Sequence, residues 1–127
     1  MQPLNIATTF VALDDACGAR PLPVNADFWD ALMNGRLGQF SRLLSFFAYE
    51  KDWTTWERHP AGEEFVCLLE GEVDLLLEQG GVQSTVTLNE KGAYVLVPKN
   101  TWHTAKVRRP CRMLFVTPGE GTENRPV

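Results

Sequence analysis

The sequence lacks the features that would assign it to a nucleic-acid-binding or membrane-spanning class of protein. It has 12 lysines and arginines against 16 aspartates and glutamates, which gives a formal net charge of -4. The basic residues form no stripe, so a nucleic-acid backbone would find little positive charge to bind. No apolar run approaches the roughly 20 residues that a membrane-spanning helix needs. We therefore expect neither nucleic acid nor a membrane as a partner.

Cysteine is also scarce in this sequence. Cys17, Cys67 and Cys111 are widely spaced and form no C-x-x-C pair, so their spacing indicates neither a disulfide framework nor a zinc ribbon. The first residues, Met1 to Asn5, lack the basic segment and apolar core of a secretory signal. These observations predict a cytoplasmic protein, because a reducing compartment suits unpaired cysteines.

The composition is otherwise that of one folded domain. Of the 127 residues, 44% are hydrophobic and 22% are charged, which is ordinary for a globular protein. A chain of this length can bury a core without disulfides or a structural metal. Near the N-terminus, Asp27 is placed to cap a short helix at 28–33, and Gly35 is placed to end it. We expect this helix to pack on the outside of a sheet.

Strand signals fill most of the remaining sequence. From Arg42 onward, short runs rich in valine, leucine, threonine and aromatic residues alternate with turns that contain glycine, proline or asparagine. Eight short strands at such regular spacing predict a sandwich or a barrel. The expected strands are 42–50, 53–59, 64–69, 72–78, 82–88, 93–97, 101–107 and 112–117.

The chain has only two histidines, and the first lies in a segment that also holds carboxylates. Glu57 and His59 are two residues apart, so on a strand their side chains point to the same face. A turn follows at 60–62, and Glu64 opens the next strand, so hairpin pairing brings its carboxylate back toward the same point. The second histidine, His103, lies in a later strand. Imidazole and carboxylate groups that converge in this way suit a first-row metal.

Strand parity predicts which side chains line the interior. Glu64 shares a face with Val66 and Leu68, which we expect to point inward, whereas Glu63 lies on the opposite, solvated face. A mostly apolar interior around a few polar groups is the usual form of a small-molecule site. The candidate rim or wall residues of this pocket, for which plain barrel core is an equal alternative, are Phe47, Tyr49, Trp53, Tyr94, Met113 and Phe115.

Two clusters of residues have the spacings of known sequence motifs. The first cluster reads Glu57-Arg58-His59, four residues, Glu64, six residues, Gly71. The second cluster reads Gly92, five residues, Pro98-Lys99-Asn100, two residues, His103. These spacings resemble the two motifs of the cupin superfamily, and the region from about 53 to 107 is similar to a small single-domain bacterial cupin.

The departures from the family pattern concern both motifs. Glu57 replaces the first metal-binding histidine, which turns a site that resembles three histidines and one glutamate into two histidines and two carboxylates. In the second motif, Asn100 replaces a glycine and Val107 replaces the closing asparagine. The change at Asn100 is mild, since asparagine tolerates left-handed backbone geometry.

The resemblance implies a metal site made of Glu57, His59, Glu64 and His103. Two neutral imidazoles and two carboxylates cancel a divalent charge, and mixed nitrogen and oxygen ligation suits Fe(II), Mn(II), Ni(II) or Zn(II). A metal-free alternative stays open, because two neighbouring carboxylates repel each other and one of them then keeps a proton. In that case Glu57 is a candidate general acid, with a histidine as base.

We therefore expect an all-β, double-stranded β-helix (cupin, or jelly-roll) barrel with a short N-terminal helix. The single cupin domain spans 1–127, with a barrel core at about 40–118, the helix at about 27–34 and a flexible polar tail at 119–127. Related small cupins commonly pair through their sheets, so the resemblance also implies a homodimer.

Three functions fit this prediction. The first is a metal-dependent enzyme that acts on a small organic molecule by dioxygenase-, isomerase- or lyase-type chemistry, and it is the preferred hypothesis. The second is a non-catalytic module that binds or senses a small molecule such as a sugar acid. The third is a metal-free acid/base isomerase. The fold alone does not select among them, since one barrel hosts many functions.

Overall fold

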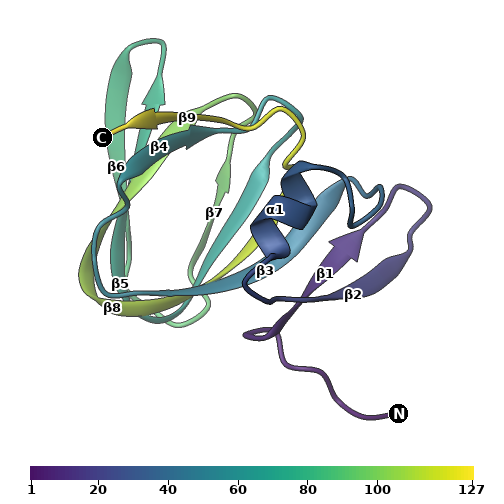
Figure 1. The fold of residues 1–127 in the computed structure, drawn as a ribbon. Helices are drawn as coiled ribbons and strands as arrows, with labels where there is room; N and C mark the ends of the chain where they lie inside the picture. Colours follow the sequence, from purple (N-terminus) through teal and green to yellow (C-terminus); the bar gives the residue numbers. More distant parts are fainter.

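The structure is a computed structural model that describes residues 1–127, and these residues form nine strands and one short helix (Figure 1). In chain order the elements are β1 (Thr9–Leu13), β2 (Ala19–Pro23), α1 (Phe28–Met33), β3 (Arg42–Tyr49), β4 (Thr55–Arg58), β5 (Glu64–Gln79), β6 (Val82–Leu88), β7 (Tyr94–Val97), β8 (Trp102–Thr117) and β9 (Glu123–Pro126).

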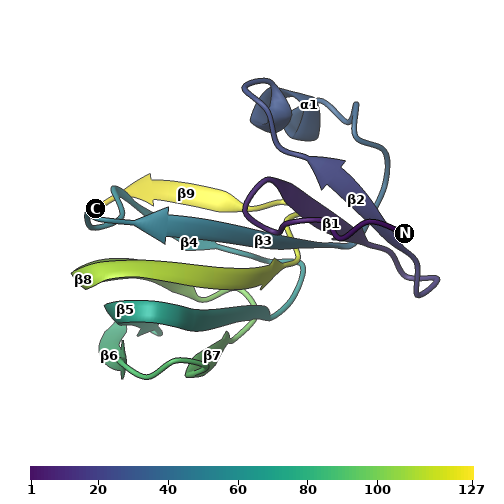
Figure 2. The ribbon, with the colours of Figure 1, turned by 90° about the horizontal axis from the view of Figure 1, so that it is seen from below.

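All strand pairs are antiparallel, and the strands form one continuous sheet that curls into a barrel. Its main path runs β2-β1-β3-β8-β4-β9, and β5 joins this path through β8 while also pairing with β6 and β7. The long strands β5 and β8 lie side by side along most of their length (Figures 1 and 2). The expected all-β, double-stranded β-helix with a short N-terminal helix is confirmed.

Strands β5 and β8 each replace two shorter strands that the sequence predicts. The turn expected at Gly71 is instead an irregularity inside β5, where the pairing with β8 shifts register between Leu68 and Val73. Gly71 has φ 90°, and a Cβ there would lie 2.1 Å from the carbonyl oxygen of Pro110. Glycine therefore lets β5 bend against β8 without ending, which is how bulges re-aim strands in barrels.

The N-terminal region adds a hairpin that the sequence does not predict. Strands β1 and β2 extend the sheet next to β3, and α1 lies close by at that end of the molecule (Figures 1 and 2). The Phe28 ring contacts Phe10 of β1 edge-to-face, with 5.4 Å between ring centroids. Asp27 precedes the helix as expected, but its side chain makes no cap hydrogen bond and pairs with Arg36 at 3.0 Å.

The barrel interior is apolar, as strand parity predicts. Val66 and Leu68 are fully buried, Glu64 lies on the same face of β5, and Glu63 is exposed. One expected wall residue, Tyr94, is 58% exposed and instead lies outside against Phe65. The buried core is made of Val66, Leu68, Val73, Leu75, Leu77, Leu88, Val97, Ala105, Cys111, Met113 and Phe115.

The polar tail at 119–127 contains strand β9, which pairs with β4 from Thr55↔Pro126 to Arg58↔Glu123. The tail is therefore part of the sheet in this structure, and its flexibility in solution stays a prediction. Helix α1 has six residues, and no helix of the chain has the length and apolar character needed to cross a bilayer.

Candidate metal centre

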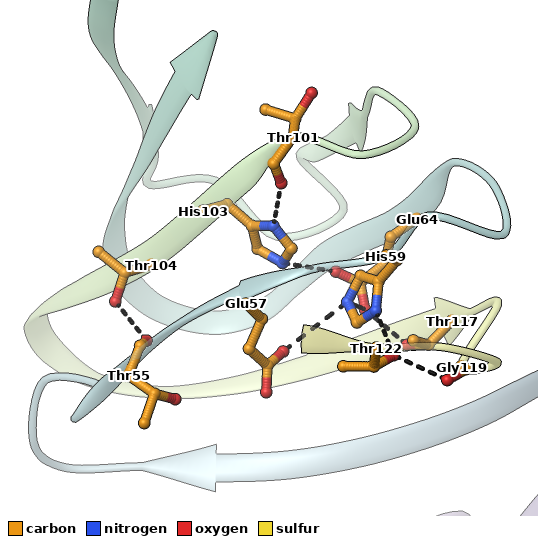
Figure 3. A network of polar contacts seen from close by, with 10 residues as sticks. All are labelled: Thr55, Glu57, His59, Glu64, Thr101, His103, Thr104, Thr117, Gly119 and Thr122. Atoms are coloured by element: carbon orange, nitrogen blue, oxygen red, sulfur yellow. Dashed lines mark hydrogen bonds and ion pairs between the residues drawn. The ribbon is translucent and has the colours of Figure 1, made fainter. Parts of the chain in front are cut away.

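Three strands bring the predicted site residues together at one place in the barrel (Figure 3). Glu57 lies on β4 directly opposite His103 of β8, and His59 follows the end of β4. Glu64 is the first residue of β5, so the turn that contains Pro60 returns its carboxylate to the histidines. His59, Glu64 and His103 are buried, and the Glu57 side chain is 35% exposed.

Three close contacts between side chains link the four residues. His103 Nε2 is 3.0 Å from Glu64 Oε1, and His59 Nε2 is 3.4 Å from Glu64 Oε2. His59 Nε2 is also 3.8 Å from Glu57 Oε2. Ligand atoms of Glu57, His59 and His103 all lie within 4.8 Å of one another.

His103 is oriented by the backbone of its own segment. Its Nδ1 lies 3.0 Å from the carbonyl oxygen of Thr101. A carbonyl can only accept, so Nδ1 holds the proton of the neutral ring, and the lone pair of Nε2 faces Glu64. Burial by itself lowers the pKa of His103, but Glu64 and the Thr101 carbonyl outweigh it and raise the pKa. A second proton therefore goes to Nε2, between the ring and Glu64.

His59 is oriented by a residue far away in the sequence. Its Nδ1 lies 2.8 Å from Thr122 Oγ1, and the Thr122 hydroxyl donates to the carbonyl oxygen of Gly119 at 2.8 Å. The single hydroxyl proton is used on Gly119, so Thr122 accepts from His59 Nδ1. The His59 backbone carbonyl accepts from the amide of Asn100, whose φ of 61° is the left-handed geometry expected there. Because Nδ1 holds the proton of the neutral ring, the lone pair of His59 Nε2 also faces the centre.

Glu64 is a buried carboxylate that stays ionised. Burial alone would raise the pKa of Glu64, but its contacts with His103 and His59 outweigh burial and hold the pKa at about 2. Thr117 donates to Glu64 Oε2 at 2.5 Å and fixes one oxygen. The other oxygen, Oε1, faces His103 Nε2 at 3.0 Å and has no partner outside the cluster.

Glu57 forms the open side of the cluster. Burial, and then the negative charge of Glu64, raise the pKa of Glu57, while His59 and His103 lower it by a smaller amount. Burial and the charge of Glu64 thus both disfavour the ionised form of Glu57. A cation at this point would remove the conflict.

The donor atoms fit a divalent transition metal. His59 Nε2, His103 Nε2 and Glu64 Oε1 are buried and have no hydrogen-bond partner outside the cluster, so only the other residues of the cluster or a bound ion can offset the cost of burying them. Donors about 2.1 Å from one ion are about 3.0 to 3.4 Å apart when the angle between them is between a right angle and tetrahedral. The 3.0 Å separation of His103 Nε2 and Glu64 Oε1 matches that range, and the ligand atoms of Glu57, His59 and His103 lie within 4.8 Å of one another.

Two aromatic residues that the sequence predicts as walls lie beside this cluster. The pKa of Tyr49 is raised by burial first and then by the charges of Glu57 and Glu64, so its phenol keeps its proton. The ring centroid of Trp53 lies 6.1 Å from that of His103 and 5.7 Å from that of Tyr49. The indole Nε1 of Trp53 is buried without a hydrogen-bond partner.

The sequence predicts the four central residues but not the residues that orient them. Thr101, Thr117 and Thr122 have no motif of their own, and Thr122 is 63 positions from the histidine that it contacts. The sequence shows only that Thr122 lies in a polar, glycine-rich tail. The roles of the four residues as ligands, the homodimer and the cytoplasmic location stay predictions.

Comparisons with known proteins agree with this fold. The family model described as "Cupin domain" matches residues 46–117. A cupin-2 domain protein of Shewanella frigidimarina is 17% identical, with 64% of this chain and 74% of that chain covered and a TM-score of 0.52. Hydroquinone 1,2-dioxygenase of Sphingomonas sp. TTNP3, with 4-hydroxybenzoate bound, is 16% identical, with 65% and 62% covered and a TM-score of 0.52.

A third similar structure is Fe(II)-HppE with an alternative substrate, which is 19% identical, with 61% of this chain and 42% of that chain covered and a TM-score of 0.52. The chain therefore spans less than two thirds of each of these two enzymes. No curated protein matches the sequence significantly. At these identities the solved structures show a shared fold.

Proposed function

The chain belongs to the cupin family, and on this premise we propose that it holds a divalent transition metal and uses it on a small organic molecule. The ligands are His59, His103, Glu64 and Glu57. Two imidazole nitrogens and two carboxylates suit iron, manganese, nickel or zinc. The two enzymes with this fold support a small-molecule substrate, since one holds 4-hydroxybenzoate and the other is an iron(II) protein with a substrate.

One observation supports the metal most strongly. The Nδ1 atoms of His59 and His103 donate to Thr122 and Thr101, so both Nε2 lone pairs face the same buried carboxylate. Metal-binding histidines are typically held in this way, with the second ring nitrogen hydrogen-bonded outside the site. A core that only had to be packed would not bury two imidazole nitrogens and a carboxylate together.

The four residues have different roles at the centre. His59, His103 and Glu64 are buried ligands, while Glu57, at 35% exposure, is the ligand that solvent reaches. A bound divalent metal supplies a Lewis acid for an oxygen of the substrate. Glu57 is also placed to take up or release a proton, because its pKa is raised by burial and by the charge of Glu64.

The aromatic residues beside the centre favour a ligand with both an apolar part and an oxygen. Trp53 and Tyr49 give an apolar wall, and the unpaired indole N–H of Trp53 is available as a donor. A ligand that satisfied this N–H would remove the cost of burying it. The variant Trp53→Phe should therefore weaken the binding of the small organic molecule and leave the metal content unchanged.

A metal-free acid/base isomerase is the second candidate, and the raised pKa of Glu57 favours it. A carboxyl with a raised pKa keeps its proton to higher pH and can serve as a general acid, with a histidine as the base. Activity that survives a strong chelator would support this candidate and contradict the metal-dependent enzyme.

Elemental analysis tests the proposed metal directly. The protein is purified without a chelator or a metal-affinity tag and compared with the His59→Ala/His103→Ala double variant. We expect near-stoichiometric iron, manganese, nickel or zinc in the native protein and none in the variant. No metal, even after incubation with each divalent ion, would contradict the proposal.

Glu64→Gln and Glu63→Gln form a matched pair for the same measurement. The two residues are adjacent, but Glu64 is 3% exposed and contacts both histidines, whereas Glu63 is exposed. Glu64→Gln should lose the metal, and Glu63→Gln should keep it. Equal loss in both variants would indicate a general electrostatic effect and not a ligand.

A further inference from the structure

The residues from 119 to 127, here called the strap, form a turn and a strand that lie against the candidate metal centre. In the turn, the Thr122 amide and hydroxyl both donate to the Gly119 carbonyl oxygen, at 3.1 and 2.8 Å. A Cβ at Gly121 would lie 3.4 Å from the ring of Pro60, the residue after His59. The turn is therefore packed against the segment of His59, and its hydrogen bonds orient the Thr122 hydroxyl.

The strap also holds the strand that bears Glu57. Strand β4 pairs with β8 at one position, Glu57↔His103, but with β9 at four positions from Thr55 to Arg58. Its other fixed point on β8 is the hydroxyl of Thr104, which donates to the Thr55 carbonyl at 2.9 Å (Figure 3). Most of the hydrogen-bonded support of β4 thus comes from the strap.

Side chains on the outer face fasten the strap to three other strands. The Arg125 guanidinium lies 5.2 Å from the ring centroid of Trp56 on β4 and 4.5 Å from that of Trp102 on β8. Arg125 also pairs with Glu78 of β5. Cation–π contacts combined with an ion pair give this residue several partners that alanine would remove.

We propose that Thr122 is a positioning residue of the metal centre and that the strap is the element that keeps it in place. This inference rests on the proposed function. The Thr122 hydroxyl accepts from Nδ1 of His59 and so keeps the Nε2 lone pair directed at the ion. Without this acceptor, the neutral ring is free to move its proton to Nε2, where Glu64 and Glu57 are the available acceptors. That tautomer does not bind a metal through Nε2.

The loss of one outer partner of a metal-bound histidine typically costs about 10- to 100-fold in metal affinity. Thr122→Val removes the hydroxyl at nearly constant shape, and Thr122→Ser keeps it. We expect Zn²⁺ affinity, measured by competition with a chromophoric chelator, to fall about 10-fold or more in Thr122→Val and to stay within about 3-fold of native in Thr122→Ser. Equal affinity in the native protein and Thr122→Val would overturn the inference.

Ring-nitrogen NMR gives a readout that needs no metal. In the metal-free native protein and in Thr122→Ser, at a pH where the ring is neutral, the His59 proton should reside on Nδ1. In Thr122→Val it should move toward Nε2, and an unchanged tautomer would overturn the inference. If the native protein binds no metal at all, the proposed function fails, and the tautomer of His59 still decides the role of Thr122.

Arg125→Ala and Arg36→Ala test the strap as a whole. Both remove an arginine from an ion pair, but Arg36 pairs with Asp27 near α1, far along the chain from the centre. We expect Arg125→Ala to reduce Zn²⁺ affinity in the same direction as Thr122→Val and to speed amide exchange in β4 and β9. Arg36→Ala should change neither. Identical behaviour of the two variants would contradict the role of the strap.

Discussion

At the scale of single residues, Glu57 lowers the stability of the metal-free protein but favours the binding of a metal. Its pKa is raised because the ionised form is partly buried and faces the charge of Glu64. A carboxyl with a raised pKa destabilises the fold above the pKa of the unfolded chain, since the unfolded state ionises more readily. The same negative charge attracts a divalent ion. Function and stability thus conflict at this residue.

The variant Glu57→Gln should separate these two effects. It removes the repulsion, so the melting temperature of the chelator-treated protein at neutral pH should rise. It also removes an anionic ligand, so Zn²⁺ affinity should fall by more than the roughly 10-fold that the loss of an outer partner costs. Calorimetry of the metal-free protein and chelator competition measure the two quantities separately.

The control for this prediction is Glu63→Gln, which removes an exposed charge next to the site and should change neither quantity. Glu57→His is the complementary variant, because it restores the histidine of the family motif. It should bind Zn²⁺ at least as well as Glu57→Gln does. If Glu57→Gln keeps native affinity, Glu57 is not a ligand.

The buried pair of Glu64 and His103 predicts a stability optimum in mildly acidic solution. The pKa of Glu64 is lowered from 4.5 to about 2, so its stabilisation is present above 4.5 and is lost as pH falls toward 2. The pKa of His103 is raised above 6.5, so its stabilisation is present below 6.5 and is lost as pH rises through the folded value. Both contributions are complete only between about pH 4.5 and 6.5.

Urea unfolding of the metal-free protein across this range measures the effect. We expect the difference in unfolding free energy between the native protein and Glu64→Gln to be largest inside the window. On the acid side it should decline by up to about 3 kcal/mol, the free-energy equivalent of the lowered pKa of Glu64. A difference that does not vary with pH would show that the pair is not ionised in the folded protein.

At the scale of elements, Gly71 decides whether β5 can pass β8 without breaking. Ala in place of Gly71 combines a left-handed φ of 90° with a Cβ 2.1 Å from a backbone oxygen that cannot move alone. Gly81 has a similar φ of 80° but no atom within 4 Å of the same position. The two glycines thus differ mainly in the space around them.

We therefore expect Gly71→Ala to cost about 3 kcal/mol or more and Gly81→Ala about 1 to 2 kcal/mol, which is the left-handed backbone strain alone. Urea unfolding of both variants checks the prediction. Equal losses would mean that β5 shifts freely at Gly71 and that the close approach to β8 is not structurally required.

Strand β5 also shows how far the sequence could predict the elements. Periodic apolar residues located the pairing segments of β5 and β8, but glycine in a turn and glycine in a bulge give the same local signal. Strand β2 was missed because Pro21 and Pro23 weaken its strand signal, and these prolines are tolerated on the sheet edge where β2 lies. Long-range pairing decided each of these cases.

The sequence predicted the four central residues of the candidate site but not the residues that orient them. The reason is again long-range strand pairing. Glu57, His59 and Glu64 are close in sequence and His103 follows at a motif spacing, so local parity was enough to bring them together. The contact of Thr122 with His59 depends on β9 pairing with β4. No local pattern in a polar tail contains that information.

At the scale of the whole molecule, the barrel combines a dry core and a charged centre on the same inner surface. Glu64 begins the face of β5 that continues with the fully buried Val66 and Leu68. Burial of such side chains contributes roughly 1.5 to 3 kcal/mol each. This stabilisation offsets the cost of burying the polar atoms of the centre in the metal-free protein. The centre is therefore held in place by the fold before any ion binds.

A preformed centre has a consequence for the stability of the entire chain. An ion that binds only the folded state adds a stabilisation that depends on its free concentration, about 2.7 kcal/mol at 100 times the dissociation constant. Addition of Zn²⁺ to chelator-treated native protein should therefore raise its melting temperature with each increase in ion concentration. The His59→Ala/His103→Ala double variant should show no such rise.

Circular dichroism of both proteins, with and without Zn²⁺, distinguishes a preformed centre from folding coupled to metal binding. We expect the far-ultraviolet spectrum of the metal-free native protein to equal that of the loaded protein, because the core of the barrel does not include the ligands. A metal-free chain that is unfolded and regains strands only with the ion would contradict a preformed centre. A melting temperature that rises equally in the double variant would place the bound ion elsewhere on the protein.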